Sequence, residues 1–82
     1  MKIYYSKTFE KKFAKYSKNL QIKIYKCIKE LPEGDVKRLK GDHTPPIYRA
    51  RISKYRILFH MDDEVIWMLK VDSRGDIYKK PS

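Results

Sequence analysis

Three arginines in the middle of this 82-residue chain are spaced so that they could bind one phosphate group together. Arg49, Arg51 and Arg56 lie in the segment 47–60, which alternates by twos like two strands around a turn at 53–54. That turn places Arg51 directly across from Arg56, although like charges in such a pair cost stability. Because guanidinium groups bind phosphate oxygens in a bidentate manner, the cluster predicts an anionic partner.

Structural roles are the alternative for these arginines and for the other polar candidates. Asp72 could lie on the same face and pair with an arginine. His60, also on that face, could carry a proton, but a half-buried histidine with a satisfied ring is favoured. Cys27 lies among apolar residues at helical spacing, which favours a buried small hydrophobe over a nucleophile. Two histidines and one cysteine show no metal-ligand spacing, so we expect no metal and no other cofactor.

The charge of the chain also indicates an anionic partner. Lys and Arg number 20 against 10 Asp and Glu, a net charge of +10. Such an excess points to nucleic acid, an acidic protein or an anionic membrane surface, with simple solubilisation as the alternative. A single cysteine allows no internal disulfide and fits a reducing compartment. No apolar run of about 18 residues could span a membrane, so we expect a cytoplasmic protein without a membrane partner.

Two amphipathic helices that could support the arginines are predicted after a short strand at 2–5. The first, capped by Ser6 or Thr8, has apolar side chains four and three residues apart. These are Phe9, Phe13 and Tyr16. The second is capped by Asn19, ends at Pro32 and has one apolar face. The side chains of that face are Leu20, Ile24, Cys27, Ile28 and Leu31.

Three antiparallel strands are predicted next, at 47–53, 54–61 and 65–72, after a strandless connection at 35–46. Alternation in the third strand would turn four apolar residues toward the helices. These are Val65, Trp67, Leu69 and Val71. The opposite face would carry Arg49, Arg51, Arg56, His60, Met68 and Lys70. We expect one α+β domain over 1–82, with an antiparallel sheet of about four strands and the helical hairpin packed on one face.

Four ordered segments resemble segments of the RelE/ParE superfamily of toxin–antitoxin toxins. They are Arg-Leu-Lys-Gly at 38–41, Tyr-Arg-Ala-Arg-Ile at 48–52, Tyr-Arg-Ile-Leu-Phe at 55–59 and Arg-Gly-Asp-Ile-Tyr-Lys at 74–79. They are similar to the family patterns "Leu-x-Gly", "Tyr-[Arg/Lys]-x-[Arg/Lys]", "Tyr-Arg-[hydrophobic]-x-[aromatic]" and "Arg-x-x-[hydrophobic]-Tyr". The four segments occur in the family's order, and the resemblance covers essentially the whole chain.

The resemblance implies a site that cleaves RNA. RelE-like toxins cut mRNA in the ribosomal A site without a metal and are silenced by a cognate antitoxin. Attack by the 2′-OH needs deprotonation of that oxygen, stabilisation of the phosphorane charge and protonation of the leaving 5′-oxygen. The catalytic residues implied by position are Arg51, Arg56, Arg74 and Tyr78. The RNA-binding residues implied are Arg49, Lys54, Lys70, Lys79 and Lys80.

Each implied residue has a distinct role. Arg56 would stabilise charge in the transition state, and Arg49 and Arg51 would bind phosphate or lower a neighbour's pKa. Arg74 would stabilise charge or donate a proton, while Tyr78 would transfer a proton or stack on a base. The implied partners are a cognate antitoxin, mRNA and the ribosome with its 16S rRNA.

Two other functions stay open at this point. A ParE-like toxin would poison DNA gyrase and cleave nothing, and a non-catalytic nucleic-acid-binding module would use the same arginines for affinity alone. The fold does not choose among them. ParE-type toxins usually lack the full Arg–Arg–Tyr set, which favours the nuclease. Ser73 stands where some nucleases of the family have a histidine, so a histidine-based mechanism is not expected there.

Overall fold

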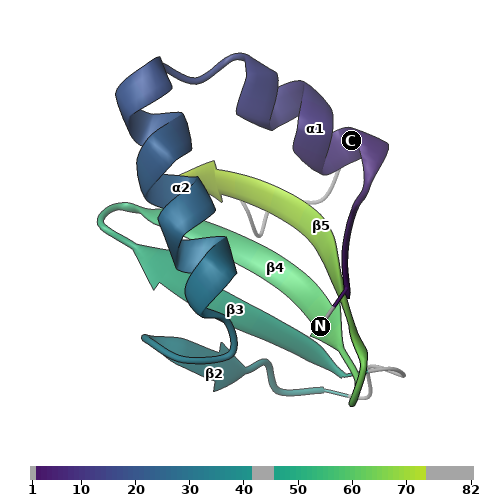
Figure 1. The fold of residues 1–82 in the computed structure, drawn as a ribbon. Coiled ribbons are helices and arrows are strands. Elements are labelled where there is room, and N and C mark those ends of the chain that lie inside the picture. The colour runs from purple at the N-terminus through teal and green to yellow at the C-terminus, as the bar shows by residue number, and fades with distance from the viewer. Residues whose placement is uncertain (1, 42–45, 74–82) are drawn as a thin grey trace.

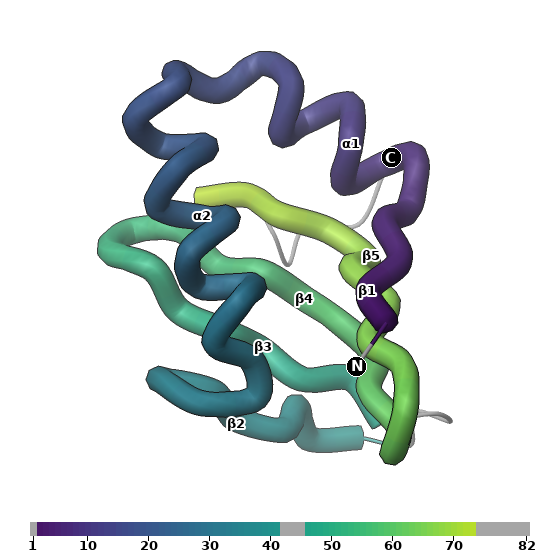
Figure 2. The backbone as a smooth tube through the Cα atoms, viewed as in Figure 1, coloured from purple at the N-terminus to yellow at the C-terminus, as the bar shows by residue number. Residues whose placement is uncertain are grey.

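Two helices cover one face of a five-stranded mixed sheet in the computed structural model, which describes residues 2–41 and 46–73 (Figure 1). In chain order the elements are β1 (Lys2–Tyr5), α1 (Lys7–Ala14), α2 (Lys18–Glu30), β2 (Val36–Arg38), β3 (Ile47–Ile52), β4 (Tyr55–Met61) and β5 (Val65–Ser73). The strand order is β1-β5-β4-β3-β2. β1 runs parallel to β5, and the other neighbours are antiparallel. The first and last of these strands therefore lie side by side (Figure 2).

The predicted α+β class and the helical hairpin on one face are confirmed, but the predicted sheet was too small and wrongly all antiparallel. The missed strand is β2, which has only three residues and pairs with β3 from within the expected connection. A strand so short has no alternation to detect. The four residues of β1 were predicted correctly as a strand. Their sequence does not encode which distant strand they pair with, nor in which direction.

Serine side chains cap the N-termini of both helices. The Ser6 hydroxyl accepts a hydrogen bond from the Phe9 N–H at 3.0 Å and donates to the Leu69 carbonyl at 2.6 Å, which ties the start of α1 to β5. The Ser17 hydroxyl accepts from the Leu20 N–H at 3.3 Å. Ser17 therefore caps α2 in place of the predicted Asn19, because the helix starts two residues earlier than expected. Neither helix in the described part of the chain is long and apolar enough to cross a membrane.

The core forms where the apolar stripes of the helices meet the sheet. α1 lies along β5, and α2 lies over β3 and β4 (Figure 1). The buried hydrophobic side chains are Phe9, Ile24, Ile28, Ala50, Ile57, Phe59, Ile66, Met68 and Val71. Partly buried members of the predicted stripes pack against them: Phe13, Tyr16, Leu20, Cys27 and Leu31. Both helical faces predicted from the sequence are thus confirmed.

A bulge interrupts the pairing of β4 with β5. Leu58 pairs with Lys70 but its neighbour Phe59 pairs with Met68, so Leu69 has no partner of its own on β4. One extra residue on a strand inverts the in–out alternation beyond it. The buried residues of β5 are consequently Ile66, Met68 and Val71.

The prediction for the faces of β5 was therefore wrong before the bulge, whereas Lys70 and Val71, which follow it, lie on their predicted faces. Trp67 was expected to face the helices, yet it is 36% exposed and lies across from His60 on the opposite face. Met68 was expected beside the arginines, yet it is fully buried in the core. Since residues 65–69 are all apolar, the sequence gives no sign of where the extra residue is inserted.

Candidate nucleic-acid interface

The β3–β4 hairpin sets the positions of the arginines. Its two-residue turn contains Ser53 with a φ of 54°, the left-handed value that such turns use. The resulting register pairs Arg51 with Arg56, as predicted, and Arg49 with Leu58. Alternation then places these arginines on the sheet face away from the helices. We call this surface the arginine face and define it by Arg49, Arg51, Arg56 and Lys70.

Arg56 is the most enclosed charged residue in the described part of the chain. It is 8% exposed, whereas Arg51 across from it is exposed. No ion pair joins Arg56 to a carboxylate within residues 2–41 and 46–73. Removing a charge from water is costly unless it is paired, so an enclosed guanidinium beside a second arginine favours binding of an anion. This arrangement suits a phosphate group.

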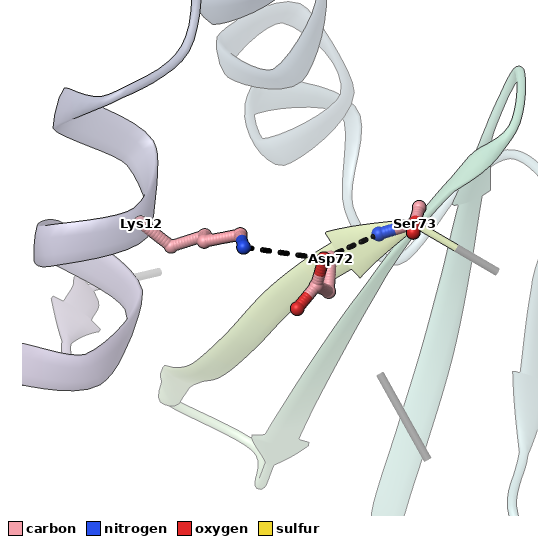
Figure 3. A network of polar contacts seen from close by, with 3 residues as sticks. All are labelled: Lys12, Asp72 and Ser73. Carbon is pink, nitrogen blue, oxygen red and sulfur yellow. Dashed lines mark hydrogen bonds and ion pairs between the residues drawn. The ribbon is translucent and has the colours of Figure 1, made fainter. Parts of the chain in front are cut away.

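Asp72 was the suggested partner for an arginine, and the structure shows a different pairing. Its Cα is in register with Arg56, but its carboxylate lies 3.5 Å from the Lys12 Nζ and accepts a hydrogen bond from the Ser73 N–H at 2.8 Å (Figure 3). Sequence reasoning missed Lys12, because the contact joins the middle of α1 to the end of β5 and no local pattern encodes it.

Arg49 has a partial structural role. Its guanidinium lies 3.7 Å from the Asp35 carboxylate, which is half exposed. The Asp35 carbonyl also accepts a hydrogen bond from the Arg51 N–H at 3.0 Å. Asp35 therefore contacts β3 through both its side chain and its backbone. Partly exposed ion pairs are weak, which leaves Arg49 able to exchange the carboxylate for a phosphate.

The other predicted basic residues are distributed unequally. Lys70 is half buried on the arginine face across from Leu58. Lys54 is at the exposed tip of the β3–β4 hairpin, with its Nζ 5.9 Å from the centroid of the Tyr55 ring. The structure therefore brings Lys70 to the arginines and leaves Lys54 at one end. The remaining predicted site residues lie outside the described residues: Arg74, Tyr78, Lys79 and Lys80.

His60 and Cys27 have the structural roles that were favoured for them. The His60 Nδ1 lies 3.0 Å from the Pro46 carbonyl oxygen, and because a carbonyl only accepts, this nitrogen carries the proton. Cys27 is half buried, and burial, with a smaller effect of the Glu30 charge, raises the pKa of its thiol. Such a thiol is a poor nucleophile at neutral pH.

Tyr16 is a polar feature that sequence reasoning assigned only to packing. Its ring packs edge-on against Tyr55, with centroids 5.3 Å apart. Its hydroxyl is buried and has no hydrogen-bond partner among the described residues. Burial, with smaller effects of Asp72 and Tyr55, raises the pKa of Tyr16 to about 12. This phenol therefore stays protonated at neutral pH.

A second surface lies on the lysine-rich sides of the helices, a composition that is typical of a solvated face and does not indicate a site. A groove of about 430 Å³ lies on the helical layer. We call it the helix groove; it is lined by Phe13, Gln21, Ile22, Tyr25, Lys18, Lys26 and Lys29. Ile22 and Tyr25 are 47% and 52% exposed. Among the described residues no acidic side chain lines it, and those that border its apolar floor with charge are all lysines. Within the described ranges, no three His, Cys, Asp or Glu side chains lie close enough together to hold a metal ion.

Comparison with known proteins relates this geometry to a family. The profile of the family described as the ParE toxin of the type II toxin–antitoxin system parDE matches residues 3–78. A curated protein of Methanocaldococcus jannaschii, provisionally named toxin RelE1, is 41% identical over 49 residues, which are 57% of this chain and 52% of that protein. The chain thus spans about half the length of the curated relative that it matches.

Solved structures with the same fold include two toxin–antitoxin complexes. One is the archaeal RelE–RelB complex of Pyrococcus horikoshii OT3, with a TM-score of 0.74, 24% identity and coverage of 92% of this chain and 96% of that one. The other is the RelB–RelE complex of Methanococcus jannaschii, with a TM-score of 0.74, 27% identity and coverage of 92% and 94%. The arrangement of helices and sheet described above is shared with both.

Proposed function

Because this chain belongs to the ParE toxin family of type II toxin–antitoxin systems, within the RelE/ParE superfamily, we propose that it is a toxin that cleaves ribosome-bound mRNA. The reaction is attack of the 2′-OH on the adjacent phosphate, without a metal. One observation carries the proposal. Arg56 is enclosed beside Arg51, without an ion pair to a carboxylate in the described ranges. Two guanidinium groups on one face would supply the positive charge that stabilises a phosphorane.

The roles of the residues follow from the charge changes of the reaction. The phosphorane carries more negative charge than the phosphodiester, and Arg56 stabilises it from a low-dielectric position where a fixed donor is most effective. Arg51 supplies the second guanidinium. Arg49, Lys54 and Lys70 hold flanking phosphates and set the register of the RNA.

Proton transfer is assigned to residues outside the described ranges. By the resemblance, Tyr78 takes or returns a proton and Arg74 stabilises the leaving oxygen. Lys79 and Lys80 add affinity for RNA phosphates. The 16S rRNA supplies a second anionic surface, which suits a chain with a net charge of +10.

The partner that silences the toxin is a cognate antitoxin, as in the two complexes whose fold this chain shares. The helix groove suits one segment of it. Apolar side chains of that segment would cover Ile22 and Tyr25, and its carboxylates would meet Lys18, Lys26 and Lys29. An acidic amphipathic helix presents these two features on one stripe.

Binding to DNA gyrase is the second candidate function, because the matching profile is that of a ParE toxin and the resemblance to ParE-like toxins implies that target. In that case the arginine face would bind protein or DNA and nothing would be cleaved. A basic module that binds nucleic acid without catalysis is the third possibility. The nuclease would cut mRNA, the gyrase poison would damage DNA, and the binding module would damage neither.

Primer extension on mRNA after induction of the chain tests the proposal. Cuts inside translated codons should appear with the wild type, disappear with Arg56→Ala and persist with Arg38→Ala. Arg38 is a matched control because it is exposed and pairs with Tyr48, on the other face of the sheet. Sedimentation with ribosomes and thermal melting would show that Arg56→Ala still binds and folds. Intact mRNA in arrested cells would exclude the nuclease, and a gyrase supercoiling assay would then test the second candidate.

A further inference from the structure

Asp72 is placed to neutralise Arg56. The two residues are register partners of β4 and β5, so their Cβ atoms lie roughly 5 Å apart on one side of the sheet. A carboxylate and an RNA phosphate bind a guanidinium through the same donors. Asp72 in contact with Arg56 would therefore compete with the proposed ligand of the site.

Lys12, on α1, forms an ion pair with the Asp72 carboxylate and holds it away from Arg56. Its Nζ approaches the Asp72 Oδ1 from α1 at 3.5 Å, and the same oxygen accepts the Ser73 N–H (Figure 3). The approach is possible because β1 pairs with β5 only at 65–68, so the end of β5 near Asp72 lies beyond β1. In the described part of the chain, Asp72 forms its ion pair with Lys12 and none with Arg56.

We propose that Lys12 is a positioning residue that draws the Asp72 carboxylate toward the helices and thereby leaves Arg56 available for an RNA phosphate. This inference rests on the proposed function, since it takes phosphate as the ligand of Arg56. Lys12 touches neither the RNA nor the reacting atoms. It acts through Asp72, by removing a competing anion.

The exposure of the pair separates this role from a contribution to folding. The side chains of Lys12 and Asp72 are 43% and 19% exposed. Ion pairs in which one side chain is largely exposed to solvent contribute little to stability. Loss of the Lys12 charge should therefore leave the melting temperature nearly unchanged and alter the binding of anions.

A mutant cycle on purified protein tests the proposal, with the affinity for a short fluorescein-labelled RNA as the readout. Lys12→Met should weaken binding about tenfold, the size expected when one charge-assisted hydrogen bond is lost. In an Asp72→Asn background, Lys12→Met should have almost no effect, because the competing carboxylate is gone. In an Arg56→Ala background it should also have almost no effect. Lys12→Arg should bind RNA like the wild type.

Lys11→Met is the matched control, because it removes the same charge from the adjacent, exposed position of α1. It should change affinity little, and equally in all backgrounds. If Lys12→Met weakens binding equally in all backgrounds, Lys12 contacts RNA itself and the proposal is wrong. The proposal is also wrong if Lys12→Met leaves affinity unchanged or if the wild type binds no RNA. If the cycle behaves as expected while primer extension finds no cuts, the nuclease fails and the role of Lys12 stands.

Discussion

Arg51 and Arg56 are direct partners across the β3–β4 hairpin; Arg51 is exposed, whereas Arg56 is buried with only 8% of its surface exposed. Two facing cations lower the stability of the free protein, so the pair is suited to a ligand and not to the fold. An anion bound between them would remove the repulsion. Ligand binding and folding stability should therefore respond oppositely to the loss of one arginine.

Arg51→Thr should raise the free energy of unfolding by about 0.2–1 kcal/mol, the range for cross-strand pairs, while weakening RNA cleavage. Threonine keeps a strand-forming side chain at the position. Urea unfolding followed by circular dichroism would measure the first effect, and primer extension the second. Arg38→Thr, on β2, is the control and should change neither. A lower free energy of unfolding for Arg51→Thr would show that the pair is stabilising.

Ser6→Ala should destabilise the protein more than Ser17→Ala. Both serines cap a helix, but only the Ser6 hydroxyl also donates to β5, at the Leu69 carbonyl. Loss of a cap costs about 1 kcal/mol, and loss of the hydrogen bond to the partly buried Leu69 carbonyl adds about 0.5–1.5 kcal/mol. Chemical denaturation of both variants would compare them. Equal losses would mean that the bond to Leu69 adds nothing.

Tyr25→Glu should weaken binding of the cognate antitoxin at least about tenfold, as for an exposed aromatic anchor of an interface. The substitution places a negative charge in the helix groove, where the proposed partner also carries negative charge. Tyr4→Glu is the matched control, because Tyr4 is similarly exposed, at 50% against 52%, but lies on β1 outside the groove. Calorimetric titration with the antitoxin would measure both. Cleavage of RNA by the free toxin should be unchanged by Tyr25→Glu.

Tyr16→Phe should remove part of the loss of stability at alkaline pH. Burial raises the pKa of Tyr16 from 10.0 to about 12. A raised folded-state pKa gives stability that is complete below the unfolded value and is lost as pH rises from about 10 through about 12. The buried hydroxyl has no partner among the described residues, so Phe should be neutral or stabilising at pH 7.

Urea midpoints of Tyr16→Phe and wild type at about pH 7 and about pH 11 would check this expectation. The difference between the two proteins should grow in favour of Phe at high pH. Tyr25→Phe, at a 52% exposed position, is the control and should show no such growth. A constant difference at both pH values would show that Tyr16 ionises equally in the folded and unfolded chain.

Sequence patterns predicted the parts of this molecule in which position along the chain determines position in space. The two-residue turn fixed the partner of each arginine, and spacings of three and four residues identified Phe9 and Ile24 as core residues. The arginine face was therefore visible in the sequence. Arg74 and Tyr78, the other two implied catalytic residues outside the hairpin, lie outside the described residues.

The features that were missed depend on single insertions or on distant contacts. One extra residue at Leu69 turned Trp67 outward and Met68 inward. The contact between Lys12 and Asp72 links residues separated by most of the chain. Neither feature leaves a periodic signal in the sequence. A bulge shifts the alternation of a strand at a single position, and an ion pair between distant residues involves no repeating pattern.

The pairing of β1 with β5 has a consequence for the order in which the protein can be assembled. β1 is synthesised first among the described strands, and its neighbour in the sheet is synthesised last. While the chain grows, the β3–β4 hairpin can form from local contacts, but β1 must wait for Val65–Ser73 to emerge. Non-local pairings of this kind fold slowly because a long loop is closed before any contact compensates for it. β1 and β5 therefore pair late, and the ion pair of Lys12 with Asp72 forms with them.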